Sequence, residues 1–419
     1  MGSVAILVGA QWGDEGKGKW IDILAKDVDL VARYQGGNNA GHTIYVDGNK
    51  VVLHQIPSGI FKEKQICALT AGVVINPVEM IGEIQSIKDI ARVSPERLWL
   101  SARSHVISPW HVYLDGKQEG ESDTPIGTTK RGIGPTYTHK AARRGLRLGE
   151  FVDETYRNEW LSGMKKDSEF VMHYEESKEA WAAFAQAAAT IKPFVCDAEA
   201  RIRKALKAGD RVLMEGAQGA LLDIDHGTYP FVTSSATSSG GCFASLGFSP
   251  RQVTEIMGVA KAYVTRVGEG PLPTQLDNHE GEHLASCGNE FGATTGRPRR
   301  CGWLDAVALR YSVEFGGYDK IILNKLDVLS GLETVKICVA YEHPRLGRIE
   351  DFPWDQRILA ECKPIYTSHK GWQEAIPKSG SFKDLPEAAR EYIKAAEEAC
   401  GCPVAYVGTG VGPKDFLSP

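Results

Sequence analysis

The chain has 419 residues, of which 42% are hydrophobic and 24% are charged, a composition typical of globular proteins. Its formal net charge of −5 argues against a general nucleic-acid or membrane-surface binder, and no apolar run approaches the roughly 20 residues of a membrane span. The nine cysteines are scattered without any C-x-x-C pair, which fits neither a disulfide framework nor a zinc site and predicts a reducing, cytoplasmic location.

The chain opens with a pattern of strand, loop and helix. Residues 4–8 are all apolar and predict a fully buried strand, which ends at Gly9. A polar, glycine-rich turn follows at residues 11–19, and apolar positions then return at helical spacing over residues 20–24. This order is typical of the first unit of a parallel α/β sheet.

The turn has the form of a phosphate-binding loop. Residues 13–19 read Gly-Asp-Glu-Gly-Lys-Gly-Lys, which contains the pattern G-x-x-x-x-G-K. Backbone N–H groups in such a turn, together with the helix N-terminus, cradle phosphate oxygens, and Lys17 or Lys19 can add a point charge. A Walker loop would continue with serine or threonine, whereas this chain has Trp20.

Two acidic residues, Asp14 and Glu15, lie inside this loop. Carboxylates beside a polyphosphate repel it unless a cation lies between them. Asp14 is therefore interpreted as a magnesium ligand, a general base, or both, with a solvated acidic turn as the alternative.

A second glycine-rich loop spans residues 36–43 and reads Gly-Gly-Asn-Asn-Ala-Gly-His-Thr. Its glycines and asparagines allow backbone conformations that bring a chain close to a ligand. His42 is a candidate acid or phosphate partner, and a purely structural histidine is the alternative.

Further polar clusters follow in chain order. Residues 126–137 and 141–145 combine hydroxyls, glycines and arginines, a mixture that suits a phosphate monoester. Residues 153–208 are alanine-rich and helical in pattern, with a C-terminal stop at residues 208–210. The run Arg211-Val212-Leu213-Met214, which is apolar from its second residue, predicts a second buried strand, with polar residues directly after it, where ligands bind in open parallel sheets.

The loop at residues 292–300 is rich in arginine. Arg297, Arg299 and Arg300 could bind a dicarboxylate through bidentate pairs, although charge runs are commonly solvated surface. Several such clusters together with two glycine loops indicate more than one anionic ligand.

The guanine-reading signature N-K-x-D occurs as Asn324-Lys325-Leu326-Asp327, directly after the predicted buried strand Lys320-Ile321-Ile322-Leu323. An aspartate there accepts hydrogen bonds from guanine N1–H and the 2-amino group, which adenine cannot offer as a pair. Residues 386–400 predict a last helix. With no linker or repeat, the sequence predicts one large α/β domain over residues 1–419, with long helical and loop insertions around a mostly parallel sheet.

The motifs are long and ordered. They read Q-W-G-D-E-G-K-G-K, R-Y-Q-G-G-N-N-A-G-H-T, I-G-T-T-x-R-G-I-G-P, E-G-A-Q-G-x-L-L-D-I-D-H-G-T-Y-P, G-N-E-F-G-A-T-T-G-R and K-L-D. This series resembles the adenylosuccinate synthetase family from about residue 4 to residue 410. The resemblance implies a homodimer that joins IMP to L-aspartate with GTP and Mg²⁺, through a 6-phosphoryl-IMP intermediate, in purine biosynthesis.

The resemblance also implies residue roles. Asp14 would remove the N1 proton of IMP and would bind magnesium together with the Gly41 carbonyl. His42 would be the acid partner on the GTP phosphates, Lys17 would contact phosphate, and Gln218 would orient the base.

The implied binding residues fall into three sets. IMP contacts are Asn39, Thr129, Gln218, Thr233, Arg297 and, from the other subunit, Arg143. Aspartate contacts are Thr294, Thr295, Gly296, Arg297 and Arg299. GTP contacts are Gly13, Asp14, Glu15, Gly16, Lys17, Gly18, Lys19, Gly41, His42, Thr43, Arg299, Lys325, Leu326, Asp327, Gly408, Thr409 and Gly410.

A few positions depart from the family's usual pattern. Pro298 stands in a loop that is usually arginine-rich, Gly408 stands where many bacterial relatives have serine, and Asn38 stands where some have histidine. The chain stops soon after Gly410, so the resemblance determines least about the C-terminal part of the guanine pocket.

Three alternatives remain at this point. Phage relatives act on dGMP to make a 2-aminoadenine precursor, and there the aspartate of the phosphate loop is commonly replaced, so Asp14 favours IMP. A regulatory GTPase would fit N-K-L-D but neither the acidic phosphate loop nor the arginine clusters. A degenerate structural paralogue would not be expected to keep Asp14, Lys17, His42, Gln218 and Asp327 together.

Overall fold

A long twisted sheet runs through the molecule. The computed structural model describes residues 2–46, 48–123, 125–291 and 296–419. Within them the central sheet has eleven strands, of which only β19 and β20 pair antiparallel. In spatial order these strands are β18 (Ser379–Ser381), β20 (Phe416–Ser418), β19 (Val404–Gly408), β14 (Lys320–Asn324), β11 (Val253–Lys261), β1 (Ser3–Gly9), β10 (Arg211–Glu215), β2 (Leu30–Arg33), β5 (Ile66–Leu69), β7 (Leu98–Ser101) and β9 (Val195–Cys196).

Smaller sheets lie around the central one. The largest contains β12 (Tyr263–Arg266), β13 (Arg300–Asp305), β15 (Thr334–His343), β16 (Gly347–Ile349) and β17 (Lys363–Lys370). The hairpin β3 (His42–Val46) and β4 (Asn49–Leu53) follows the second glycine loop, and β6 (Val74–Ile75) pairs with β8 (His105–Val106).

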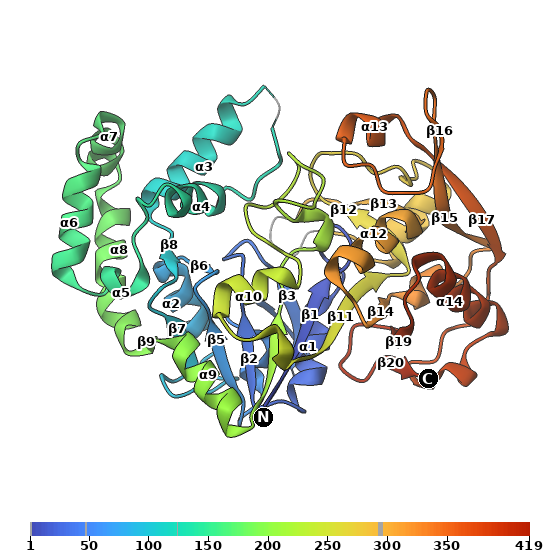
Figure 1. Ribbon diagram of the computed structural model, residues 1–419, viewed down its shortest axis with the longest axis horizontal. Coiled ribbons are helices and arrows are strands. Elements are labelled where there is room, and N and C mark those ends of the chain that lie inside the picture. Colours follow the sequence, from blue (N-terminus) through green and yellow to red (C-terminus); the bar gives the residue numbers. More distant parts are fainter. Residues whose placement is uncertain (1, 47, 124, 292–295) are drawn as a thin grey trace.

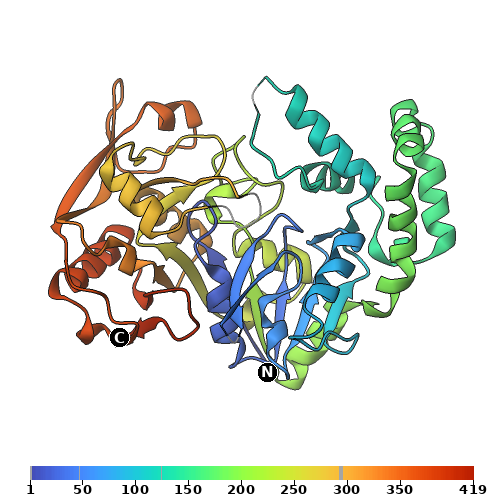
Figure 2. The same ribbon diagram turned by 180° about the vertical axis from the view of Figure 1, so that it is seen from behind.

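Helices pack around the sheet, and three of them form one end of the molecule. They are α1 (Lys17–Ala25), α2 (Pro77–Ser86), α3 (Pro109–Glu121), α4 (Ile133–Ala141), α5 (Leu148–Phe151), α6 (Glu154–Met164), α7 (Ser168–Glu176), α8 (Lys178–Ile191), α9 (Ala198–Ala208), α10 (Gly240–Leu246), α11 (His279–Cys287), α12 (Ala306–Gly316), α13 (Gln356–Glu361) and α14 (Glu387–Cys400). Short 3-10 helices are η1 (Ser58–Phe61), η2 (Lys192–Phe194), η3 (Ala220–Leu222), η4 (Pro250–Gln252), η5 (Leu326–Leu329) and η6 (Phe382–Asp384). Helices α6, α7 and α8 stand together at one end of the molecule, while β17 and α14 lie at the opposite end (Figure 1, Figure 2). No helix in the described residues is long and apolar enough to cross a membrane.

The strand β1 lies in the middle of the core. Val4 and Ile6 pack into one hydrophobic cluster and Leu7 into another, because successive side chains of a strand point to opposite faces. Helix α1 covers the Leu7 face through Trp20, and α9 covers the other face through Ile202. Burial on both faces explains why this strand reads as a continuous apolar run.

The three predicted buried strands and the mostly parallel α/β sheet are confirmed. Two boundaries differ from the prediction. Helix α1 begins at Lys17 rather than at residue 20, because Gly16 adopts a left-handed conformation (φ 91°) and starts the helix inside the phosphate loop. The helical region 153–208 is interrupted by the short strand β9, and its predicted stop is confirmed, since α9 is followed by left-handed Gly209.

Candidate active site

A cavity of about 780 Å³ opens where the central parallel strands end. The loops after β1, β2, β10 and β14 all contribute to its wall, as expected for ligand sites in open parallel sheets. The predicted site residues that line it are Gly13, Asp14, Glu15, Gly16, Lys17, Gly18, Lys19, Asn39, Gly41, His42, Thr43, Thr129, Gln218, Thr233, Arg297, Arg299, Lys325 and Gly410. Seven separate segments of the sequence prediction therefore meet in one place.

The remaining predicted residues lie elsewhere. Leu326 is fully buried in the hydrophobic core, and Arg143 is exposed just after α4. Asp327 is the last residue of the guanine signature, Gly408 is the last residue of β19, and Thr409 follows it directly. These three residues and Gly296 do not line the cavity wall. Thr294 and Thr295 lie outside the described residues.

The phosphate loop separates its two acids. Glu15 turns inward, accepting hydrogen bonds from the backbone N–H of Gln11 (3.1 Å) and Gly13 (2.8 Å) and pairing with Lys17 Nζ at 2.7 Å. Asp14 has a positive φ of 59° and keeps about a third of its side chain (31%) exposed. Glu15 therefore stabilises the loop, and Asp14 is the acid of this loop that is available to a ligand.

Arg299 joins the arginine-rich loop to the phosphate loop. Its Nε donates to Asp14 Oδ2 at 2.9 Å, although the two residues are 285 positions apart in the chain. The guanidinium is largely buried, with 9% of the side chain exposed. A residue predicted to bind aspartate thus contacts the residue predicted to act as the base.

Lys19 has a different role from Lys17. Its Nζ donates to the carbonyls of Gly410 (2.9 Å) and Asp415 (2.6 Å), which ties α1 to the end of the chain. Burial lowers the pKa of Lys19 to about 8, against the opposing charges of Asp415 and Asp327. These two hydrogen bonds hold the segment that contains Gly410 and Asp415 against the cavity.

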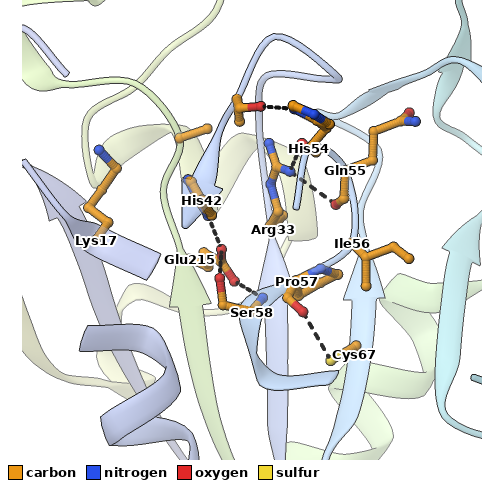
Figure 3. A network of polar contacts seen from close by, with 12 residues as sticks. Lys17, Arg33, His42, His54, Gln55, Ile56, Pro57, Ser58, Cys67 and Glu215 are labelled. Carbon is orange, nitrogen blue, oxygen red and sulfur yellow. Dashed lines mark hydrogen bonds and ion pairs between the residues drawn. The ribbon is translucent and has the colours of Figure 1, made fainter. Parts of the chain in front are cut away.

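His42 is oriented by a buried carboxylate (Figure 3). Its Nδ1 bonds Glu215 Oε1, and Glu215 also accepts from the backbone N–H and hydroxyl of Ser58, both at 2.9 Å. Burial lowers the pKa of His42, against the pull of Glu215, whereas His42 and Arg33 outweigh burial to hold the pKa of Glu215 below its usual value. Because an ionised carboxylate only accepts, Nδ1 carries the proton and Nε2 is left for the cavity.

Glu215 was quoted in a motif but given no role by the sequence prediction. The signal for it was its position at the carboxyl end of strand β10, three residues before Gln218. Which of those polar residues turns toward His42 depends on packing between β10 and β3, which local pattern does not contain.

Gln218 lies against the second glycine loop. Its φ is 56°, and among the described residues its buried Oε1 has no hydrogen-bond partner. A Cβ on Gly36, whose φ is 79°, would lie 3.0 Å from that oxygen, so glycine is needed for the close approach. The amide of Gln218 is therefore held at the cavity wall with an oxygen ready for a donor.

The segment predicted to hold a phosphate monoester also reaches the cavity. Arg297 Nη2 donates to the Gly127 carbonyl at 2.8 Å, which places Arg297 beside Thr129. Glu119 on α3 accepts from the backbone N–H of Gly127 (2.7 Å) and Thr128 (3.2 Å). The Glu119 carboxylate thus occupies N–H groups of the kind that bind anions.

Arg300 does not belong to this wall. Its Nη2 donates to the carbonyls of Gly268 (2.9 Å) and Gly270 (2.8 Å). The expectation that Arg297, Arg299 and Arg300 act together on a dicarboxylate is therefore wrong for Arg300. Arg300 is the first residue of β13, and neighbouring residues of a strand point in opposite directions.

The guanine signature is tied to the phosphate loop. Asn324 Oδ1 accepts from Trp20 Nε1 at 2.6 Å, and Asn324 Nδ2 donates to the Glu15 carbonyl, also at 2.6 Å. A Cβ on Gly408 would lie 2.1 Å from Asn324 Oδ1. The glycine that departs from the family's usual serine is thus required by this packing.

Asp327 carries an unused acceptor. Its Oδ1 is buried and, within the part of the chain that the structure describes, has no hydrogen-bond partner. Burial raises the pKa of Asp327, while the positive charges of Lys325 and Lys19 oppose that shift. A buried, unpartnered carboxylate oxygen in a native fold calls for a ligand donor.

The oxygen donors suit magnesium. Asp14 and Gly41 line the same cavity, and no group of three or more metal-binding side chains occurs among the described residues. Mg²⁺ is commonly bound by one or two protein oxygens together with substrate phosphates rather than by a complete protein cage. Asp14 with the Gly41 carbonyl fits that arrangement.

The comparisons with known proteins agree with this geometry. The adenylosuccinate synthetase family model matches residues 6–417. Adenylosuccinate synthetases of Geotalea daltonii and Lactococcus lactis subsp. lactis are each 46% identical, and both alignments cover 97% of this chain and 96% of the relative. The structure of fully ligated adenylosuccinate synthetase from Plasmodium falciparum superimposes with a TM-score of 0.94, at 38% identity and 100% coverage of both chains.

A phage enzyme shares the fold at greater distance. Cyanophage S-2L succinoaminodeoxyadenylate synthetase, bound to dGMP and dATP, matches with a TM-score of 0.65 and 20% identity, covering 100% of this chain and 95% of that one. At that identity the likeness shows the fold alone. Because the adenylosuccinate synthetases match this chain at much higher identity than the phage enzyme does, the hypothesis that the substrate is IMP is favoured over the hypothesis that it is dGMP.

Proposed function

This chain belongs to the adenylosuccinate synthetase family of GTP-dependent ligases, and we propose that its cavity binds IMP, L-aspartate, GTP and Mg²⁺ to make adenylosuccinate, GDP and phosphate. The observation that carries the proposal is one cavity lined by Asp14, His42, Gln218, Arg297 and Lys325, which come from distant parts of the chain. One nucleotide alone would not use so many anion-binding groups.

The chemistry requires a base and a phosphoryl donor. The O6 of IMP belongs to a lactam and is a poor leaving group. Asp14 takes the N1 proton, O6 attacks the γ-phosphorus of GTP, and GDP leaves. The aspartate amine then attacks C6 of 6-phosphoryl-IMP. The C6–O6 bond breaks, and O6 leaves as part of the released phosphate.

Four side chains assist these steps. The Glu215 carboxylate would stabilise the charged form of His42, whose Nε2 then donates to the GTP phosphates. Gln218 would orient the hypoxanthine base, and Lys17 would add a positive charge beside the transferred phosphoryl group. Magnesium, when bound at Asp14 and Gly41, would offset the negative charge of the phosphates.

Binding roles follow the wall of the cavity. Asn39, Thr129, Thr233 and Arg297 would hold IMP, and Arg299 together with residues 294–297 would hold aspartate. Asp327 would accept from guanine, with Lys325 and residues 408–410 beside it. We also propose that residues 1–419 form a single catalytic domain that works in the cytoplasm.

A homodimer is proposed because Arg143 is exposed just after α4 and does not line its own cavity. If Arg143 completes the neighbouring IMP site, mixing Asp14→Ala and Arg143→Ala subunits should restore about a quarter of wild-type activity, because half of the dimers are mixed and each has one intact site. The measurement is adenylosuccinate formation after subunit exchange.

The matched control for that mixture is Asp14→Ala with His42→Ala. Both changes fall in the wall of one subunit's own cavity, so their mixture should restore nothing. Arg143 is not shared if its mixture with Asp14→Ala gives no more than the sum of the separate variants.

The overall reaction is tested by omission. Phosphate release by the purified protein should require GTP, IMP, aspartate and Mg²⁺ together. The absorbance at about 280 nm should rise as the substituted purine forms. Replacing IMP by dGMP should abolish the release. Phosphate release with dGMP in place of IMP would assign the phage-type activity. Phosphate release from GTP without aspartate would assign a GTPase.

A further inference from the structure

One buried carboxylate joins the arginine-rich loop that ends at Arg300, called the aspartate loop below, to residues 324–327, called the guanine loop. The side chain of Glu290, three residues beyond α11, is completely buried. Its Oε2 accepts from Lys261 Nζ at 2.8 Å and from Arg299 Nη1 at 2.5 Å, and its Oε1 accepts from Lys325 Nζ at 2.6 Å and from the Tyr263 hydroxyl. All four partners donate, so both carboxylate oxygens are fully used.

These partners come from separate elements. Lys261 ends β11, Tyr263 begins β12, Arg299 directly precedes β13, and Lys325 begins the turn into η5. Glu290 itself does not line the cavity, whereas Arg299 and Lys325 both do. Glu290 therefore acts on the cavity only through residues that bind to it.

The contacts form a continuous line of ion pairs. Lys325 bonds Glu290, Glu290 bonds Arg299, and Arg299 Nε bonds Asp14 Oδ2 at 2.9 Å. The line thus runs from the guanine signature, through the arginine of the aspartate loop, to the proposed base.

The charges explain why Glu290 stays ionised. Burial alone would raise the pKa of Glu290, but Lys261, Lys325 and Arg299 outweigh burial and hold that pKa well below its usual value. Burial lowers the pKa of Lys261 to about 8 despite the attraction of Glu290. Removing the negative charge would leave Lys261, whose side chain is completely buried, without a counter-ion, which proteins tolerate poorly.

We propose that Glu290 is a positioning residue that sets Arg299 and Lys325 in place at once, and so couples guanine recognition to the aspartate site. The inference rests on the proposed function, since it assigns those two residues to aspartate and GTP. GTP and aspartate do not touch Glu290 but depend on it, whereas IMP depends on it least, because Asn39, Thr129 and Thr233 hold IMP from other segments.

The test is Glu290→Gln, which keeps the shape of the side chain and removes its charge. The KM values for GTP and for aspartate should each rise about ten-fold or more, and the KM for IMP should change less than about two-fold. GDP binding by calorimetry should weaken in parallel with the KM for GTP. A purely structural role would instead raise all three KM values alike or change none, and either result would overturn the inference.

Glu199→Gln is the matched control. Glu199 is also buried (3% exposed), bonds Arg103 at 3.1 Å and the Ala71 N–H at 2.8 Å, and lies on α9 away from the cavity. It should leave all three KM values unchanged. If Glu290→Gln does not fold, judged by circular dichroism, Glu290→Asp keeps the charge with a shorter reach and should show the same selective pattern.

Wild-type turnover is measured first, which separates the two hypotheses. A wild-type protein that does not join IMP to aspartate would contradict the proposed function. A wild-type protein that does so, with a Glu290→Gln variant whose KM values are unchanged, would overturn only the role of Glu290.

Discussion

The Asp14→Ala variant is expected to lose turnover by about a thousand-fold or more while still binding GTP. Without the carboxylate nothing takes the N1 proton of IMP, so O6 remains a weak nucleophile for the γ-phosphorus. GTP should still bind, because the backbone cradle, Lys17 and the guanine loop are separate from this side chain. The measurements are kcat by adenylosuccinate formation and nucleotide affinity by calorimetry.

Asp27→Ala is the control for that result. Asp27 is exposed and lies two residues beyond the end of α1, so the same substitution there should leave kcat unchanged. Near-normal turnover of Asp14→Ala would show that the base has been assigned to the wrong residue. Loss of GTP binding as large as the loss of kcat would mean that Asp14 serves the nucleotide more than the proton transfer.

The Asp327→Ala variant is expected to raise the KM for GTP by about a hundred-fold, with the KM for IMP almost unchanged. The variant removes the buried acceptor that guanine N1–H and the 2-amino group would use. The advantage of GTP over ITP should shrink as well, because ITP lacks the 2-amino group. Initial rates with each nucleotide at saturating IMP and aspartate provide the measurement.

Asp319→Ala serves as the comparison. Asp319 is exposed and directly precedes β14, at the opposite end of the same strand from the guanine loop. It should not change the KM for either nucleotide. An equal rise in the KM values for GTP and IMP in Asp327→Ala would point to a general loosening of the cavity and would contradict guanine reading by Asp327.

Much of the framework could be predicted from the sequence, because it depends on neighbouring residues. Residues 4–8, 212–214 and 321–323 are apolar without interruption because the strands that contain them are buried on both faces. Ligand groups follow such strands directly, so the phosphate loop and the guanine signature could be found by position. The start of α1 was misplaced since Gly16 begins the helix within a polar segment, where no apolar periodicity marks it.

The sequence by itself determined the fold class and the family, and most of the residues that it assigned to the site line the cavity. The tertiary structure alone decided what those residues touch. Trp20 bonds Asn324 across 304 positions, Arg299 bonds Asp14 across 285, and Glu215 bonds His42 across 173.

Such partners have no local signature. A motif shows which side chains follow a strand. The direction in which each of those side chains points depends on how strands that are distant in sequence pack side by side. That is why Arg300 looked equivalent to Arg299 in the sequence and turned away in the fold. It is also why Glu290 had no role in the sequence prediction, although it binds Lys261, Arg299 and Lys325 in the structure.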